Sequence, residues 1–277
     1  MNKKIFFIII AVAIIGCLFS SCPPPPPPNQ GLPLNISVFV DLSDRIVKES
    51  NGMRGLEKDT AIVRIITDFV SQNAFAKKIK FNKDHIKVFF YPVPTGPGIA
   101  TTAEKLDVNF ADFDKAQIKE KQAAAGQLTK NFNDGLKTIY DAALADGNFI
   151  GSDIWGFFNT QAQKTCVMEG YRNVLVIITD GYIYHKDNLV EDKANKQATY
   201  ITKTTLAQGY TLTPIAGKIS NLEVLVVELN PDPVTDFAKM ESAISDWFKA
   251  IGISRYEILK TDLPANSKKP IIDFLNP

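Results

Sequence analysis

The sequence predicts an α/β fold, with a doubly wound, mostly parallel sheet flanked by helices on both faces. Two observations support this. Most of the long apolar runs are nearly continuous and do not alternate with polar residues, as is typical of strands covered on both faces. Helical patterns lie between these runs, and strands that alternate with helices imply parallel neighbours joined by helical crossovers. The four predicted strands are residues 35–43, 85–93, 173–181 and 222–230.

Two further segments have weaker strand patterns, and one segment has a strong helix pattern. Residues 256–262 favour a fifth parallel strand, and residues 106–110 favour a short strand at an edge of the sheet. Residues 59–79 place large apolar side chains on one helical face, so they predict an amphipathic helix. Asp59 is the expected N-cap of this helix, because a carboxylate accepts hydrogen bonds from the free N–H groups of the first turn.

Three further segments predict helices. Residues 115–146 are rich in Lys, Gln and Ala, and a glycine in their interior predicts two helices broken near Gly135. Residues 152–163 begin with two good capping residues, serine and aspartate. Residues 235–252 carry apolar side chains at helical spacing and are expected to end at Gly252.

The beginning of the chain has the layout of an export signal. Lys3 and Lys4 form a positive head, and residues 5–15 are an unbroken apolar run that is short for a membrane span. Small residues and cysteines follow it. We therefore expect residues 1–21 to be the signal peptide of a bacterial lipoprotein, with an uncleaved anchor or a plain cleaved signal as the alternatives.

Two cysteines compete as the lipidated residue. The segment "IIGC" at Cys17 is closer to the strict lipobox pattern, whereas "FSSC" at Cys22 is followed directly by a linker, and we favour Cys22. Residues 22–33 are expected to hold the lipidated cysteine and a polyproline spacer. Six consecutive prolines form an extended rod and cannot join a sheet or a helix interior. Residues 34–277 are the predicted folded domain.

Composition narrows the class of function. The net charge is +1 and no basic tract stands out, so we expect no nucleic-acid partner. Loss of Cys17 and lipidation of Cys22 would leave Cys166 alone, without a disulfide partner. The chain has only two histidines, His85 and His185, which makes a zinc site a poor expectation.

Polar side chains gather at the ends of two predicted strands and at one helix start. Ligands of open α/β sheets bind beyond the carboxyl ends of the strands, so these groups are expected to converge. They are carboxylates and hydroxyls, the hard oxygen ligands that suit Mg²⁺, Mn²⁺ or Ca²⁺. The residues are Asp41, Ser43, Asp44 and Arg45 where the first strand ends, Ser152 and Asp153 at the helix start, and Thr179, Asp180 and Gly181 where the third strand ends.

These motifs resemble the von Willebrand factor A domain, whose metal-ion-dependent adhesion site combines D-x-S-x-S after the first strand with a later T-D-G. In this chain "DLS" supplies Asp41 and Ser43, and "VLVIITDG" supplies Asp180. The segment "GSDIW" resembles the loop that carries the intermediate hydroxyl, here Ser152. The resemblance covers nearly all of residues 34–263. It implies a von Willebrand A, Rossmann-like fold and a metal site for Mg²⁺ or Mn²⁺ held by these four residues.

One position departs from that motif. Arg45 stands where the family has its second serine, and arginine cannot ligate a cation. In one reading Arg45 swings away, Asp44 or a water takes the missing place, and a metal still binds. In the other reading Arg45 folds over the site and pairs with Asp41 and Asp180, so that an internal salt bridge replaces the metal.

No catalytic set is visible in the sequence, so the chain is expected to be a binding module and not an enzyme. We expect a lipid-anchored protein of the cell envelope, exposed outside the cytoplasm, that engages a protein partner and meets the membrane through its N-terminal lipid. A metal-free scaffold neutralised by Arg45 is the main alternative, and a metal-dependent hydrolase using Asp41 is a weaker one. The expected rim of the pocket is Asp44, Arg45, Asp153, Thr179 and His185.

Overall fold

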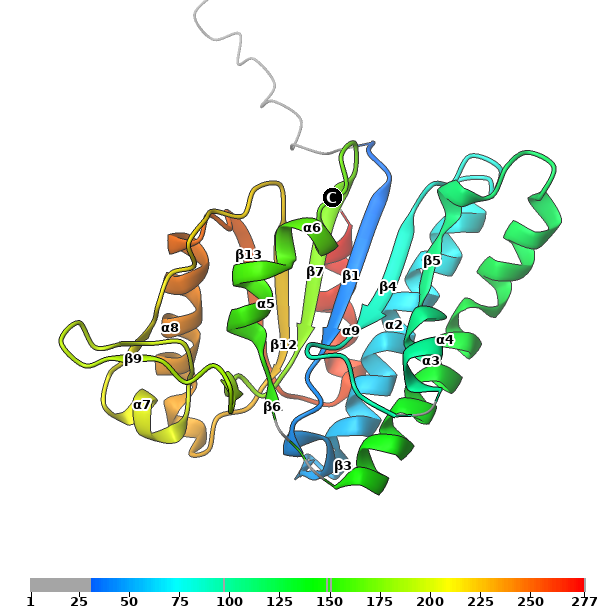
Figure 1. Cartoon of the computed structure of the whole chain (residues 1–277). Helices are drawn as coiled ribbons and strands as arrows, with labels where there is room; N and C mark the ends of the chain where they lie inside the picture. Colours follow the sequence, from blue (N-terminus) through cyan, green and yellow to red (C-terminus); the bar gives the residue numbers. More distant parts are fainter. Residues whose placement is uncertain (1–30, 97, 148, 150, 277) are drawn as a thin grey trace, which may run out of the picture. The chain divides into compact units, whose positions relative to one another are not determined.

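A six-stranded sheet forms the centre of the domain in the computed structural model, which describes residues 31–96, 98–147, 149 and 151–276 (Figure 1). Five strands are parallel, and the edge strand β5 is antiparallel to β4. The predicted fold class is therefore confirmed. The strand order is β13 (Arg255–Lys260), β12 (Glu223–Leu229), β7 (Arg172–Ile178), β1 (Leu34–Val40), β4 (His85–Phe89) and β5 (Asp107–Asn109).

The predictions for residues 1–30, including the export signal and the lipidation of Cys22, lie outside the described residues. From Gly31 onward the chain packs as one unit. None of the helices in the described part of the chain is both long enough and apolar enough to span a membrane.

Helices cover both faces of the sheet (Figure 1). One face packs against α2, α3, α4 and α9, and the other packs against α5, α6 and α8. The sheet therefore has a hydrophobic core on each face. In strand β1, Val38 and Val40 belong to the first core and Phe39 belongs to the second, because successive side chains point to opposite faces. The helices are α2 (Gly55–Ala76), α3 (Ile99–Glu104), α4 (Ile118–Asp146), α5 (Ile154–Thr160), α6 (Ala162–Cys166), α7 (Lys203–Ala207), α8 (Phe237–Ala250) and α9 (Pro264–Leu275).

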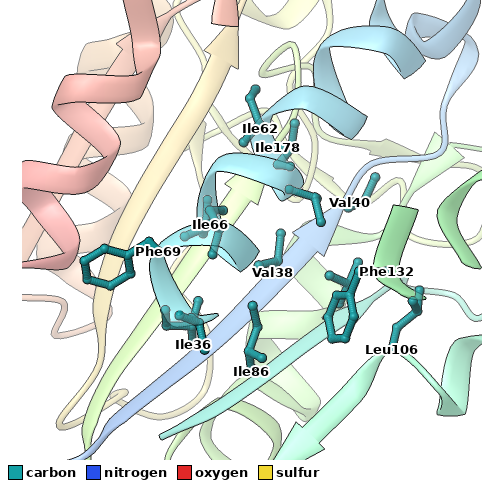
Figure 2. Close-up of a cluster of buried hydrophobic side chains, with 14 of the residues drawn as sticks. Ile36, Val38, Val40, Ile62, Ile66, Phe69, Ile86, Leu106, Phe132 and Ile178 are labelled. Carbon is teal, nitrogen blue, oxygen red and sulfur yellow. The ribbon is translucent and has the colours of Figure 1, made fainter. Parts of the chain in front are cut away.

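The first core is built mainly by α2 lying over β1. Ile62 and Ile66 of α2 lie above Val38 and Val40 of β1, and all four side chains are fully buried (Figure 2). Burying a side chain of this size stabilises a fold by about 1.5–3 kcal/mol, so this contact fixes the position of α2 on the sheet. The N-terminal turns of α2 are thereby held beside the carboxyl end of β1.

Short elements join the main strands and helices, and many of them lie at the carboxyl edge of the sheet or in the long connection after β7. These elements are η1 (Asp44–Val47), β2 (Glu49–Ser50), β3 (Met53–Arg54), η2 (Phe110–Asp112), β6 (Gly151–Ser152), β8 (Tyr184–His185), β9 (Glu191–Asp192), β10 (Gln197–Ala198), β11 (Thr211–Leu212) and η3 (Val234–Asp236).

Two helix predictions were wrong. The helix α4 is continuous through Gly135, and this glycine serves close packing: a Cβ there would lie 2.7 Å from the Leu106 side chain. The helix α2 begins at Gly55, so Asp59 is not its N-cap. Instead Asp59 is fully buried in the second turn, on the face that meets the sheet.

Candidate functional site

The side chain of Asp41 is fully buried where β1 ends. One of its oxygens, Oδ1, accepts a hydrogen bond from the Ser43 backbone N–H at 2.9 Å. The other, Oδ2, accepts a hydrogen bond from the Thr179 hydroxyl at 2.8 Å. Strands β1 and β7 are neighbours, and the Asp41 backbone N–H also bonds to the carbonyl of Ile178 at 3.1 Å. Thr179, expected at the rim, is thus a buried partner of Asp41.

Asp180 follows β7 and is half-buried beside Asp41. Its Oδ1 accepts a hydrogen bond from the backbone N–H of Tyr182 at 3.1 Å. Burial and the charge of Asp41 together raise the pKa of Asp180 to about 6, against the opposing charge of Arg45. The charge of Asp41 therefore acts on Asp180 across the ends of β1 and β7.

Arg45 turns inward, beneath Asp41. Its side chain is only 5% exposed. The Nη2 atom donates hydrogen bonds to both carboxylate oxygens of Asp59, at 2.9 and 2.8 Å, and to the carbonyl of Ile178 at 3.1 Å. The Nε atom lies 3.7 Å from Oδ2 of Asp41. The guanidinium thus meets Asp41 from the inner side and makes its strong contacts with Asp59.

Asp59 and Tyr140 complete this buried cluster, and sequence reasoning missed both roles. The Tyr140 hydroxyl donates to Oδ2 of Asp59 at 2.9 Å. Burial raises the pKa of Asp59 to about 6, against the opposing charge of Arg45. Burial would lower the pKa of Arg45, but the charges of Asp59 and Asp41 outweigh it and raise that pKa. A signal was present: Asp59 precedes Ile62 and Ile66 by three and seven positions, on the apolar face of the predicted helix.

The two serines predicted for the metal site lie at the same edge. Ser43 is half-buried in the turn after β1. Ser152 is buried on β6, and its hydroxyl oxygen accepts a hydrogen bond from the backbone N–H of Leu42 at 3.1 Å. The chain from β1 is thus tied to the segment that precedes α5, as the pattern of residues predicted.

Three predicted rim residues have structural roles of their own. Asp44 is exposed and pairs with Lys48 at 2.9 Å. Asp153 caps α5, since its Oδ1 accepts from the backbone N–H of Gly156 at 2.8 Å. His185 lies on β8, which pairs with β6. None of these three contacts the carboxylate of Asp41 or of Asp180 through a described hydrogen bond.

A pocket of about 640 Å³ opens at this edge of the sheet, and we name it the carboxyl-edge pocket. Ser43 and Asp180 line it, together with exposed or half-buried tyrosines and lysines that belong to the loops after β1 and β7. The full lining is Ser43, Asp44, Lys48, Gly147, Phe149, Gly151, Asp180, Tyr182, Tyr184, Ile201, Thr202 and Lys203.

The donors at this pocket suit a cation that keeps several of its waters. In the described part of the chain, no group of three or more His, Cys, Asp or Glu side chains is arranged to hold a metal ion. Both oxygens of Asp41 are already engaged, so Asp180 and Ser43 are the residues left to reach an ion directly. Mg²⁺ is commonly held by one or two carboxylates and retains its remaining waters. The donor chemistry therefore fits a weakly held hydrated divalent cation.

Comparison with known proteins gives little further guidance. No family model matches the chain, and no curated protein matches it. Among solved structures, it is similar to a pilus adhesin, SpaC from Lactobacillus rhamnosus GG, with 14% sequence identity and a TM-score of 0.41. The match covers 89% of this chain and 31% of the adhesin chain, so this chain spans about a third of that protein's length. A likeness of this degree carries no argument about function.

Proposed function

We propose that this protein is a lipid-anchored binding module of the von Willebrand factor A type, which engages a protein partner outside the cytoplasm through the carboxyl-edge pocket. One observation carries the proposal. Asp180 lines this pocket, and no cationic side chain among the described residues forms a salt bridge with it. The nearest buried cation, Arg45, directs its hydrogen bonds to Asp59. The carboxylate of Asp180 is therefore free to bind a positive group from outside.

A divalent cation, Mg²⁺ or Mn²⁺, is the ligand that this carboxylate and its neighbours suit best. Asp180 and Ser43 would hold the ion, while Asp41 and Ser152 would support it from the buried side. A bound cation would give an acidic side chain of a partner a positive centre to meet, which ties recognition to the ion. The raised pKa of Asp180 supports this reading. Burial and the charge of Asp41 both disfavour the ionised carboxylate, and a nearby cation would offset these two effects.

Calorimetric titration with Mg²⁺ and Mn²⁺ tests the cation. We expect the purified chain to release or absorb heat with a millimolar or lower Kd, and we expect Asp180→Asn to abolish the signal. Asp141→Asn is the control, because Asp141 is an exposed carboxylate outside the pocket that pairs with Lys137. Equal behaviour of wild type and Asp180→Asn would remove the cation from the proposal.

Recovery of the partner from membranes tests the binding role. The tagged chain should retain a partner in the presence of Mg²⁺ and lose it when a chelator is added. The Asp180→Asn variant should fail to retain that partner under both conditions. A partner retained equally by Asp180→Asn would place the interface elsewhere on the molecule.

Lipidation is proposed from the sequence alone and needs its own experiment. Incorporation of a labelled fatty acid should occur in the wild type and be lost in Cys22→Ser. The variant Cys17→Ser is the matched control and should keep the label. The reverse outcome would make Cys17 the lipidated residue.

A metal-free scaffold is the second candidate, and the position of Arg45 favours it. The guanidinium is buried and lies 3.7 Å from Oδ2 of Asp41, so it already neutralises part of the charge that a cation would balance. In this case partner binding would not depend on chelators. We propose binding and not catalysis in either case, because the groups described around Asp41 are carboxylates, hydroxyls and a guanidinium, without a nucleophile–base pair.

A further inference from the structure

A second pocket lies beside the first and shares Asp180 with it. It has a volume of about 600 Å³, and we name it the Glu228 pocket. Its floor includes three nearly buried charged side chains, Arg45, Lys58 and Glu228. Its full lining is Arg45, Lys48, Glu49, Ser50, Met53, Gly55, Lys58, Asp180, Tyr182, Lys203, Glu228, Asn230, Pro231, Asp232, Val234 and Thr261.

The backbone is strained where Glu228 enters this pocket. Glu228 has a φ of +70°, in the left-handed region that favours glycine. The pairing of β12 with β13 shifts register between Val226 and Leu229, which is the mark of a bulge. Val226 and Leu229 belong to the core under α8, whereas Glu228 contacts Lys58 of α2 on the opposite face. The bulge therefore turns the Glu228 carboxylate toward α2 at a conformational cost.

The carboxylate that this strain positions is only half satisfied. Its Oε2 accepts a hydrogen bond from the Thr261 hydroxyl at 2.6 Å and lies 3.3 Å from Nζ of Lys58. Its Oε1 is buried and accepts no hydrogen bond within the described part of the chain. The residue is 5% exposed, so an acceptor that carries negative charge is held at the pocket without a donor. A buried acceptor of this kind is costly unless something supplies the missing donor.

The charges of the pocket identify the missing group as a cation. Each cationic side chain in its lining is already engaged by a carboxylate. These pairs are Arg45 with Asp59, Lys58 with Glu228, Lys48 with Asp44, and Lys203 with Asp232. Two carboxylates of the lining, Glu49 and Asp180, form no salt bridge with any described residue. The unused capacity of the pocket is therefore for accepting hydrogen bonds and positive charge.

We propose that the Glu228 pocket binds a primary ammonium group, carried by a small amine or by a lysine side chain of a bound peptide. The ammonium donates one N–H to Oε1 of Glu228 and is further attracted by Asp180. A primary ammonium is a compact point charge with three donors, which matches an isolated acceptor better than a planar guanidinium does. Its single charge is also repelled less by the neighbouring Lys58 than a divalent ion would be. This site has Glu228 as its acceptor and adjoins the proposed cation site at Asp180 and Ser43, with which it shares Asp180.

Titration of the wild-type chain with small probes tests the proposal by two-dimensional NMR of the backbone amides. The probe n-butylammonium should shift the amides of Thr261 and Gly55 and should bind at least about tenfold more tightly than n-butanol. Tetramethylammonium, which has the charge and no N–H, should bind as weakly as n-butanol. Equal binding of all three probes would overturn the proposal. So would shifts of these amides by Mg²⁺ in the absence of any response to n-butylammonium.

Two peptides distinguish the sources of the ammonium. A short peptide with one central lysine should bind more tightly than n-butylammonium if a partner protein supplies the group, and its Nε-acetyl-lysine counterpart should not bind. If the lysine peptide binds no more tightly than n-butylammonium, a free amine is the ligand class. If neither source binds, the proposal is wrong.

A paired variant assigns the effect to Glu228. Removal of Glu228 alone would leave Lys58 buried without a carboxylate, so we choose Lys58→Met combined with Glu228→Gln, which removes both charges together. This double variant should lose n-butylammonium binding by about tenfold or more and keep the Mg²⁺ response of the Asp180 site. Asp141→Asn, which changes an exposed carboxylate outside the lining, is the control and should change binding by less than about threefold. A folded double variant that still binds n-butylammonium would overturn the proposal, and the probe series on the wild type decides it if the double variant does not fold.

Discussion

The guanidinium of Arg45 and the carboxylate of Asp59 form a buried ion pair, with Nη2 of Arg45 2.8 Å from Oδ2 of Asp59. The pair joins the turn after β1 to the second turn of α2, and both side chains are 5% exposed or less. It lies directly beneath Asp41, so it determines how much positive charge the candidate site receives from within the protein.

Removal of Asp59 should destabilise the protein strongly. In Asp59→Ala the charge of Arg45 stays buried without its main partner, and breaking a buried pair in this way costs about 3–5 kcal/mol. The free energy of unfolding in urea measures the loss. Asp141→Ala is the control, because it removes an exposed partner of Lys137 and should cost less than about 0.5 kcal/mol. Similar losses of unfolding free energy in the two variants would show that the buried pair contributes no more to stability than an exposed pair does.

Asp180 should make stability depend on pH in a predictable direction. Its folded pKa is raised to about 6 from an ordinary value of 3.8, so between these values the folded state holds a proton that the unfolded state has lost. The contribution of Asp180 to stability is therefore fully present below pH 3.8 and is lost as the pH rises through 6. Without divalent ions, Asp180→Asn should exceed the wild type in free energy of unfolding by about 1 kcal/mol at pH 7, after allowance for solvent screening.

The same comparison at low pH is the control for Asp180. At pH 3.5 the wild-type carboxyl is protonated in the folded state and mostly protonated in the unfolded state, so the two proteins should be equally stable to within about 0.3 kcal/mol. Asp59 titrates in the same range in both proteins, and its contribution cancels in the difference. A difference between wild type and Asp180→Asn that stays constant from pH 3.5 to pH 7 would contradict the raised pKa.

Exchange of the buried pair for neutral residues should strengthen cation binding. The variant Arg45→Ser, Asp59→Asn removes one positive and one negative charge together, and it leaves the buried Asp41 without its cationic neighbour. The positive charge 3.7 Å from Asp41 then no longer opposes an incoming ion, and the Kd for Mg²⁺ should fall by about tenfold. Addition of Asp180→Asn to the same variant should reverse the gain. An unchanged Kd in calorimetric titration would mean that Arg45 does not restrain metal binding.

Two glycines of α4 should respond to alanine in opposite directions. Gly126 is exposed, and nothing lies within 4 Å of a Cβ built there, so Gly126→Ala should stabilise the protein by about 0.5–1 kcal/mol. A Cβ at Gly135 would lie 2.7 Å from Cδ2 of Leu106, so Gly135→Ala should destabilise it by about 1–2 kcal/mol despite the better helix propensity. The free energy of unfolding in urea compares the two variants. An increase in both would show that the Leu106 side chain moves aside at little cost.

Much of the fold was accessible from the sequence because burial leaves a pattern. Strands covered on both faces must be apolar throughout, and the runs that end at Asp41 and Asp180 read in that way. Their neighbouring places in a parallel sheet bring their carboxyl ends together, which is why the two aspartates could be paired without a structure. The helix that follows Ser152 could be predicted because serine and aspartate are residues that commonly cap a helix start.

Only the tertiary structure decided where the long side chains go. The sequence left Arg45 either swung away or lying across the site, and the structure turns it inward to Asp59, which is 14 residues away, and thus near Tyr140. A flexible arginine can reach many points, and the choice depends on which acceptor lies inside the packed interface of α2 with the sheet. The break predicted at Gly135 was wrong for a similar reason. A glycine allows either a bend or a close contact, and here the contact with Leu106 explains its presence.

The sequence by itself thus determined the layers of the fold and the oxygen-rich end of the sheet, because both follow from the periodicity of burial along single elements. The tertiary structure alone decided the charge balance of that end. The inward pairing of Arg45 with Asp59 joins elements distant in the chain, and so does the bulge beside which the buried Oε1 of Glu228 has no hydrogen-bond donor among the described residues. Electrostatic free energy depends on distances and burial in three dimensions, and a linear pattern of residues does not contain them.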